Sequence, residues 1–374
     1  MATFRDGSST TATDIRDLAP TTPVPASANR GTGNPTAPPQ RDIHHRPRTA
    51  DVDWPSLAHA YGPADDMPGL LAALRVPDAA ARRRARRRLA GSVFHQGDRY
   101  SATAPTIPHL IAAADDPGTP DRERILRLVA LLAVGYDDAH IPGGFDAVGL
   151  RAEAARIAAR DVGEARLAMA AWVADAPNDD IRANRAYLLD VRDFAAERDQ
   201  AAWALRCYDE ALAGAPAYRR LLRDPDPSVR TAAAYLLGWF PEDAAATIPL
   251  LAARAAADPD GTAAATAALA ASLLGGGTAV APWAVRTLAD TAAADREDPA
   301  TRPTATRAAA LALTLSAPPR PDETTQRAAA ILTDLLTLPG AEDAPGPRDE
   351  VPRLPYLDGD WSALAAAVLG RPDS

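Results

Sequence analysis

The chain contains no lysine, so all 40 of its basic side chains belong to arginine. Without lysine there is no phosphate-loop lysine, no lysine that forms a Schiff base and no serine–lysine dyad. Cys207 is the single cysteine of the 374 residues, which excludes an internal disulfide and the disulfide-rich class of secreted domains. We therefore expect a protein of a reducing compartment.

Aromatic residues make up only 5% of the chain, and long alternating runs of Val, Ile, Thr and Tyr are missing. This disfavours a sheet-based fold, and the hydrophobic content of 47%, much of it alanine, predicts an all-α fold. The first residues lack the apolar stretch of a secretion signal, and no later window approaches the roughly 18 apolar residues of a membrane span. We expect a cytoplasmic protein without a membrane segment.

Motifs that carry chemistry are also missing. The histidines outside the first 50 residues are widely spaced, and there is no His-Glu-x-x-His motif or paired-cysteine motif that would predict a zinc site. The glycine-rich run 275–278 has no following lysine, and no serine lies in a Gly-x-Ser-x-Gly motif. We accordingly predict no metal, no cofactor and no enzymatic activity.

The most informative segment that is present, 222–238, predicts the end of one helix, a turn and a second helix. Asp226 can cap the second helix, Pro227 occupies its first position without losing a hydrogen bond, and Gly238 can end it. One side of this helix is apolar and holds Val229, Ala232, Ala233, Leu236, Leu237 and Phe240. Arg230, Thr231 and Tyr235 lie on the other side, which we expect to face solvent.

Connectors that combine a proline and an acid precede several alanine-rich helices. They recur at 77–78, 116–121, 224–227 and 258–260. Their spacing of roughly 35 to 50 residues is the period of paired-helix solenoids. We therefore expect an α-solenoid of antiparallel helix pairs, about six in number.

Composition divides the chain into three segments. Residues 1–50 are rich in Thr, Pro, Ala, Gly and Asn, which predicts a disordered N-terminal tail. Residues 51–340 repeat the helix–turn–helix theme, although the connectors between 139 and 216 are less regular. Residues 341–374 combine a linker rich in proline and acids with a short C-terminal helix, Trp361–Leu369, which we expect to cap the array.

The segment 222–238 resembles a HEAT repeat, whose second helix follows a turn of Asp-Pro-Asp, two variable residues, Val-Arg, alanines and a closing Leu-Gly. The matching residues are Asp224, Pro225, Asp226, Val229, Arg230, Ala232, Ala233, Leu236 and Gly238. The resemblance is looser at 77–91, and at 119–135 and 258–275 only the helix pairing is kept. It implies a HEAT-like solenoid over about 60–340, a ladder to which Asp226 and Arg230 contribute, and a binding scaffold without a reaction of its own.

The segment 82–88 contains six arginines and is the densest charge cluster of the chain. On a helix, Ala81, Ala85 and Leu89 leave only a narrow apolar seam, and like charges three or four residues apart repel each other. Nearby acids offer a structural explanation, since Asp65, Asp66, Asp78, Asp115 and Asp116 can neutralise the arginines. The functional alternative is a docking face for an acidic protein or a phosphate backbone, but charge runs are usually solvated faces.

The segment 92–103 is predicted to be a polar and aromatic loop between two helices, and such loops often carry specificity. His95, Gln96, Asp98, Arg99 and Tyr100 can form a hydrogen-bonding patch that recognises a partner. In the purely structural alternative, Gly97 permits a left-handed turn, Phe94 and Tyr100 fill the gap between helix pairs, and His95 bonds a buried carbonyl.

We favour a non-enzymatic scaffold that binds a protein partner at this loop and at Arg83, Arg84 and Arg87. The alternative is a nucleic-acid binder or HEAT-like DNA glycosylase in which helix 82–88 and Trp172, Trp203 or Trp239 line one groove. Only the arginine cluster favours it, and the net charge of -9 opposes it because phosphate contacts depend on clustered cations. A lyase of the phycobilin-lyase type shares the HEAT-like pattern, but the chain has no cofactor motif.

Overall fold

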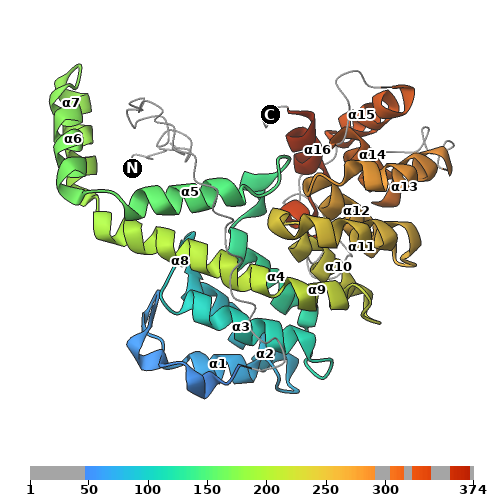
Figure 1. Cartoon of the computed structure of the whole chain (residues 1–374), viewed down its shortest axis with the longest axis horizontal. Coiled ribbons are helices and arrows are strands. Elements are labelled where there is room, and N and C mark those ends of the chain that lie inside the picture. Colours follow the sequence, from blue (N-terminus) through green and yellow to red (C-terminus); the bar gives the residue numbers. More distant parts are fainter. Residues whose placement is uncertain (1–46, 291–303, 316–321, 338–353, 371–374) are drawn as a thin grey trace, which may run out of the picture. The chain divides into compact units, whose positions relative to one another are not determined.

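The computed structural model describes residues 47–290, 304–315, 322–337 and 354–370, all within one compact unit, Ile43–Ser374 (Figure 1). The disordered tail expected over 1–50 falls almost entirely on residues 1–46, outside the described residues. Most of the linker expected from residue 341 onward also lies outside them. The described part is helical, and the prediction of an all-α solenoid is confirmed.

Sixteen α helices lie within the described residues. They are α1 (Met67–Ala73), α2 (Ala79–Val93), α3 (Thr103–Asp115), α4 (Arg122–Val134), α5 (Ala147–Ala158), α6 (Val162–Ala174), α7 (Asp179–Val191), α8 (Phe194–Ala213), α9 (Ala215–Leu221), α10 (Pro227–Leu237), α11 (Ala244–Ala257), α12 (Gly261–Leu273), α13 (Gly277–Asp290), α14 (Thr304–Leu315), α15 (Glu323–Leu335) and α16 (Trp361–Leu369). The short C-terminal helix therefore forms over the expected residues, and it packs against α14 and α15.

Short 3-10 turns and two small hairpins complete the described structure. The turns are η2 (Thr49–Asp51), η3 (Trp54–Ser56), η4 (Asp137–His140), η5 (Pro241–Asp243) and η7 (Tyr356–Gly359). The hairpins pair β1 (Ala58–His59) with β2 (Gly62–Pro63) and β3 (Phe94–His95) with β4 (Asp98–Arg99), both antiparallel. Since each strand has only two residues, the hairpins leave the fold class unchanged.

Aspartates begin many of these helices, because a carboxylate can accept the hydrogen bond of an N–H that has no partner inside the helix. The side chains of Asp78, Asp226, Asp260 and Asp322 cap α2, α10, α12 and α15 in this way. At α10 the N–H of Ser228 donates to Asp226 Oδ1 over 2.9 Å, and Pro227 follows at the first helical position. The cap and the proline thus set the start of the helix that the sequence predicts.

In the middle of the chain, two helix pairs that are neighbours in the stack are not neighbours in the sequence. The pairs α1–α2, α3–α4, α9–α10, α11–α12 and α13–α14 each pack internally, and the second helices α4, α10, α12 and α14 pack in that succession. Because α10 lies directly on α4 and α9 contacts α3, the helices α5–α8 are inserted between two neighbouring pairs. The inserted α8 packs on α3 and α4 (Figure 1). The region with irregular connectors, 139–216, contains this insertion.

The expectation that Arg230 and Tyr235 face solvent is wrong, since both residues are buried. That expectation gives α10 one face that packs and an opposite face that is exposed to solvent. Instead α10 contacts α4, α9 and α12, so little of its surface reaches solvent. Thr231 remains half-buried.

Arginines at the starts of three second helices bind acids of the turn that follows along the stack. Arg82 Nε donates to Asp121 over 2.8 Å, Arg122 Nη2 pairs with Asp224 over 2.7 Å, and Arg230 binds both oxygens of Asp258 over 2.8 and 2.7 Å. We call these three ion pairs the turn ladder. The partner of Arg230 is Asp258, whereas Asp226, which the resemblance implies as a ladder residue, caps α10.

The turn ladder predicts a specific loss of stability in acid. The hydrogen bond from Arg82 holds the pKa of Asp121 below its ordinary value of 3.8, although burial opposes this. A carboxyl whose pKa is lowered on folding stabilises the fold above its ordinary pKa, and this contribution is lost as the pH falls through the lowered pKa. In the variant Asp121→Asn, the amide should tolerate the φ of 53° at this position.

We therefore expect Asp121→Asn to be less stable than the wild type at pH 7, and the two to converge below pH 3.8. Urea unfolding between pH 7 and pH 3 measures the difference. A difference that stays constant over this range would contradict the role of the Asp121 carboxylate.

Candidate functional site

The segment 92–103 folds as a tight hairpin. Gln96 and Gly97, with φ of 53° and 91°, form the two-residue turn between β3 and β4. Both residues lie in the left-handed region that such turns require. The pair Gln-Gly is not among the dipeptides that favour such a hairpin, so Gly97 alone predicted a left-handed turn and the hairpin was missed.

Arg99 attaches this hairpin to the helices beneath it. Its guanidinium donates to the carbonyl oxygens of Leu132 and Ala133 at the end of α4, over 2.8 and 3.3 Å, and burial lowers its pKa. The backbone of Arg99 exchanges two hydrogen bonds, of 3.0 and 2.9 Å, with the side chain of Gln200 on α8. Two guanidinium nitrogens, Nε and Nη2, thus bond the end of α4, and the role of Arg99 is to position the hairpin.

The accessible part of the hairpin is small. Gln96 and Asp98 are exposed, and His95 is half-buried with its ring 5.5 Å from that of Tyr61. Tyr61 is 67% exposed at the turn between β1 and β2, and no motif in the sequence marks it as a candidate. Tyr100 is half-buried, burial raises its pKa, and its N–H donates to Thr103 Oγ1.

Four of the six clustered arginines lie within 4 Å of a carboxylate. Arg82 and Arg86 share Asp121, at 2.8 and 3.7 Å. Arg84 approaches Asp78 to 3.9 Å, and Arg88 binds Asp66 over 3.0 Å. Asp66 and Asp78 were expected in this role, but Asp121 was not. Arg83 and Arg87, four residues apart, are exposed and have no carboxylate partner among the described residues.

Two adjoining depressions lie on the second helices. The first has a volume of about 400 Å³ and is lined by Arg86, Arg87, Ala90, Arg127, Leu128, Leu131, Gly135, Tyr136, Asp137, Tyr235 and Pro355. The second, of about 290 Å³, is lined by Glu123, Arg127, Pro227, Ser228, Thr231, Ala232, Asp260, Thr262 and Pro355. Both include Arg127 and Pro355, so we treat them together as the second-helix groove.

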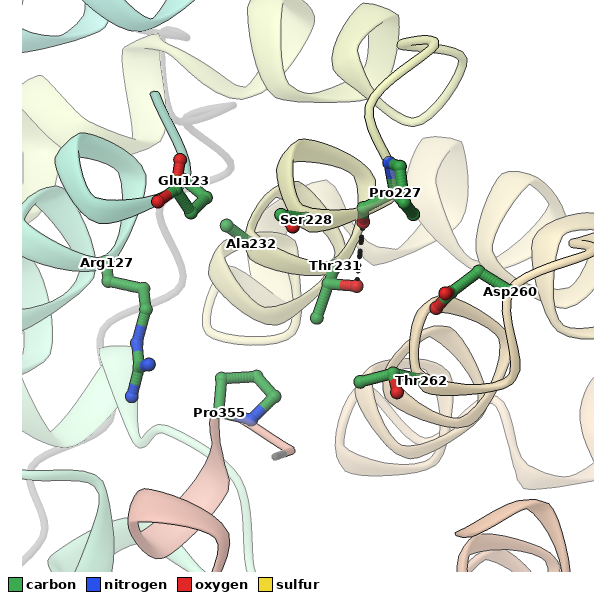
Figure 2. Close-up of a pocket in the computed structure, with 9 residues that line it drawn as sticks. All are labelled: Glu123, Arg127, Pro227, Ser228, Thr231, Ala232, Asp260, Thr262 and Pro355. Atoms are coloured by element: carbon green, nitrogen blue, oxygen red, sulfur yellow. Dashed lines mark hydrogen bonds between the residues drawn. The ribbon is translucent and has the colours of Figure 1, made fainter. Parts of the chain in front are cut away.

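Figure 2 shows how the side chains of the smaller depression lie. Glu123 and Arg127 come from α4 on one side, and Asp260 and Thr262 come from the start of α12 on the other. Thr231 of α10 lies between them, and its hydroxyl donates to the carbonyl oxygen of Pro227 over 2.9 Å. The smaller depression is therefore formed by three second helices, α4, α10 and α12, which stack on one another.

The hairpin supports one wall of the larger depression. The ring of Phe94 on β3 packs edge-on against Tyr136 at 5.5 Å, and Tyr136 lines the groove. Successive residues of a strand point to opposite faces, so His95, next to Phe94, faces Tyr61 instead. The two sequence-predicted sites thus meet at Tyr136, while His95 lies on the other face of the hairpin.

The tryptophans that a base-excision site would need are not gathered here. Trp239 is fully buried, Trp172 stacks on Arg185 at 4.4 Å within the α6–α7 pair, and Trp203 is half-buried on α8. None of the three lines the second-helix groove. Cys207 is also buried, and burial raises the pKa of its thiol to about 12.

Within the described ranges, no three histidine, cysteine or acidic side chains come together as a metal site. Across the same ranges, every helix is too short or too polar to cross a bilayer.

The family of HEAT repeats matches residues 183–272, from within α7 to within α12. This range contains the 222–238 unit and the Arg230–Asp258 pair of the turn ladder. No curated protein matches the chain.

Proposed function

Because this chain is a HEAT-repeat α-solenoid, we propose that it is a non-enzymatic scaffold that binds a protein partner in the second-helix groove. The observation that carries the proposal is the groove itself, two adjoining depressions built from α2, α4, α10 and α12. A scaffold of stacked pairs holds such a surface rigidly, since α4, α10 and α12 pack on one another in succession. Fold alone assigns no partner, so the partner must be inferred from the side chains that line the groove.

Charge favours an acidic segment at the α2 end of the groove. Arg86, Arg87 and Arg127 line the larger depression, and Arg83 lies one turn from Arg87 on the same helix. Two exposed like charges at this spacing repel each other by a few tenths of a kcal/mol in the free protein. A carboxylate of the partner would remove this repulsion and add charge-assisted hydrogen bonds.

We include the accessible hairpin residues in the proposed partner surface with separate roles. His95, Gln96 and Asp98 are available to a partner that extends beyond the groove, together with Tyr61. Arg99 is a positioning residue that holds the hairpin on α4 and α8. Arg84 is exposed and only loosely paired, so it can contribute long-range attraction.

The nucleic-acid and glycosylase alternatives gain no support from the described residues. The groove contains Glu123, Asp137 and Asp260 beside its arginines. A nucleic-acid strand carries a phosphate at every nucleotide and would bring negative charge to these carboxylates, whereas a peptide can confine its acidic residues to the α2 end. Duplex binding at low salt that weakens steeply with added salt would revive the nucleic-acid alternative.

Charge reversal on α2 tests the proposed function. Phage-displayed random peptides selected on the wild-type protein should be enriched in Asp and Glu. The double variant Arg83→Glu/Arg87→Glu should bind the selected peptides about tenfold more weakly or worse, because two attractive charges become repulsive. Fluorescence anisotropy of labelled peptides gives the dissociation constants.

The matched control is Arg206→Glu/Arg223→Glu, which makes the same charge change at two exposed arginines outside the groove. It should leave the affinity within about twofold, since neither arginine lines the groove and exposed charges are screened by salt. Equal losses in both double variants would mean that only net charge matters. Selection of peptides without acidic residues would contradict the proposal directly.

A further inference from the structure

A segment near the C-terminus, Leu354–Gly359, lies against the groove. Leu354 and Tyr356 are buried, and the ring of Tyr356 packs edge-on at 4.9 Å from Tyr235 and 5.7 Å from Trp239, both of the α10 region. The N–H of Leu357 donates to Asp137 Oδ2 over 3.0 Å. The hydroxyl of Tyr235 donates to the same oxygen over 3.1 Å, so Asp137 connects the segment to α10.

This segment separates the two depressions of the second-helix groove. Pro355 lines both of them, and its neighbour Tyr356 fills the space over Tyr235, which lines the larger one. The segment is a short turn, η7, held by the buried side chains of Leu354 and Tyr356 and by one backbone hydrogen bond, so few contacts attach it to the groove. Removing the segment would join the depressions and expose Tyr235 and Trp239.

The segment carries two features that weaken its own attachment. The hydroxyl of Tyr356 is buried and has no hydrogen-bond partner among the described residues. Leu357 has a φ of 46°, in the left-handed region that non-glycine residues rarely adopt. A peptide with a phenylalanine in place of Tyr356 would avoid the first cost, and a peptide with glycine or asparagine in place of Leu357 would avoid the second.

We propose that Leu354–Gly359 is a built-in occupant of the partner site, and that the partner is an acidic peptide with an aromatic residue after a proline that displaces it. The aromatic side chain takes the place of Tyr356 between Tyr235 and Trp239, and the following N–H takes the place of Leu357 at Asp137. The acidic residues meet Arg87 and Arg127. This inference rests on the proposed function and names the partner chemistry of the same groove.

Two substitutions of Tyr356 test the displacement, because they should change the affinity for a displacing peptide in opposite directions. Tyr356→Ser removes the internal aromatic anchor, and Tyr356→Phe removes only the unpartnered hydroxyl. A labelled peptide with the sequence of residues 348–360 should bind Tyr356→Ser at least tenfold more tightly than the wild type, because less of the site is occupied from within. The peptide should bind the Tyr356→Phe protein more weakly than it binds the wild type, because the internal segment is then held more tightly. A peptide that itself carries phenylalanine at position 356 should bind the Tyr356→Ser protein more tightly than the original peptide does.

A second measurement uses the wild-type protein, so it tests the inference even if the Tyr356→Ser variant does not fold. Hydrogen exchange at the Leu357 amide should accelerate when the peptide is added to saturation, while exchange in α12 stays unchanged. Unchanged protection of Leu357, or equal peptide affinity for the wild type and the folded Tyr356→Ser variant, would overturn the inference. The proposed function would survive that result if acidic peptides selected on the wild type still bound in an Arg83- and Arg87-dependent manner.

Discussion

Replacement of Arg230 by alanine is expected to lower the free energy of unfolding by about 3 kcal/mol. The side chain of Asp258 is 0% exposed, and Arg230 binds both of its oxygens. Removing one partner of a buried ion pair leaves a charge without compensation in the interior. Arg254, 3.4 Å from Asp258, keeps one weaker contact, so we expect the lower end of the range for such variants.

Replacing Arg230 also removes hydrogen bonds from the turn before α10. Arg230 Nη1 donates to the carbonyl oxygens of Asp224 and Pro225 over 2.9 and 3.2 Å, and the variant leaves both without this donor. Urea unfolding followed by circular dichroism at neutral pH measures the effect. The control is Arg182→Ala, whose partner Asp179 is 94% exposed, and it should change stability by about 0.5 kcal/mol or less. Similar losses in both variants would show that the Arg230–Asp258 pair has no special role.

The second large effect is expected from adding volume to α12. Five of its alanines, Ala265, Ala267, Ala268, Ala270 and Ala271, are 0% exposed, because α12 packs against α10, α11 and α14 at once. Ala268→Leu should therefore destabilise the protein by about 2 kcal/mol, since a close-packed interior cannot take the extra methyl and methylene groups without strain.

The same substitution at an exposed alanine is the control. Ala171 lies on α6, none of whose residues is buried, and Ala171→Leu should change stability by less than about 0.5 kcal/mol. If thermal unfolding showed Ala268→Leu to be neutral as well, the packing around α12 would be looser than the structure indicates.

Local features of the fold follow from the sequence. The cap by Asp226 and the position of Pro227 depend on residues within one turn of the helix, so the start of α10 could be predicted to the residue. The stacking of α10 on α4 depends on contacts between residues about one hundred positions apart, and no local pattern reports it. The ladder pair Arg122–Asp224 crosses the same insertion, so the sequence does not reveal that Asp224 is the acid of this turn that joins the ladder.

The candidate site could be predicted only in part for the same reason. The charge cluster 82–88 is visible in the sequence, but which arginines stay unpaired depends on Asp121, which lies in a later turn. Arg99 looked available for a partner because its acceptors, the carbonyl oxygens of Leu132 and Ala133, are backbone groups that a sequence pattern does not reveal. The groove combines residues of α2, α4, α10 and α12 with Pro355, and only the tertiary structure brings them together.

Site-specific crosslinking tests the central claim, partner binding in the second-helix groove, most directly. A photoreactive benzophenone amino acid at Thr231 lies between the two sides of the smaller depression, whereas the same group at Ala256 lies on an exposed position of the first helix α11. Peptides selected on the wild-type protein should crosslink to position 231 and not to position 256. Crosslinks at position 256 in equal yield, or none at position 231 with a bound peptide, would contradict binding in the groove.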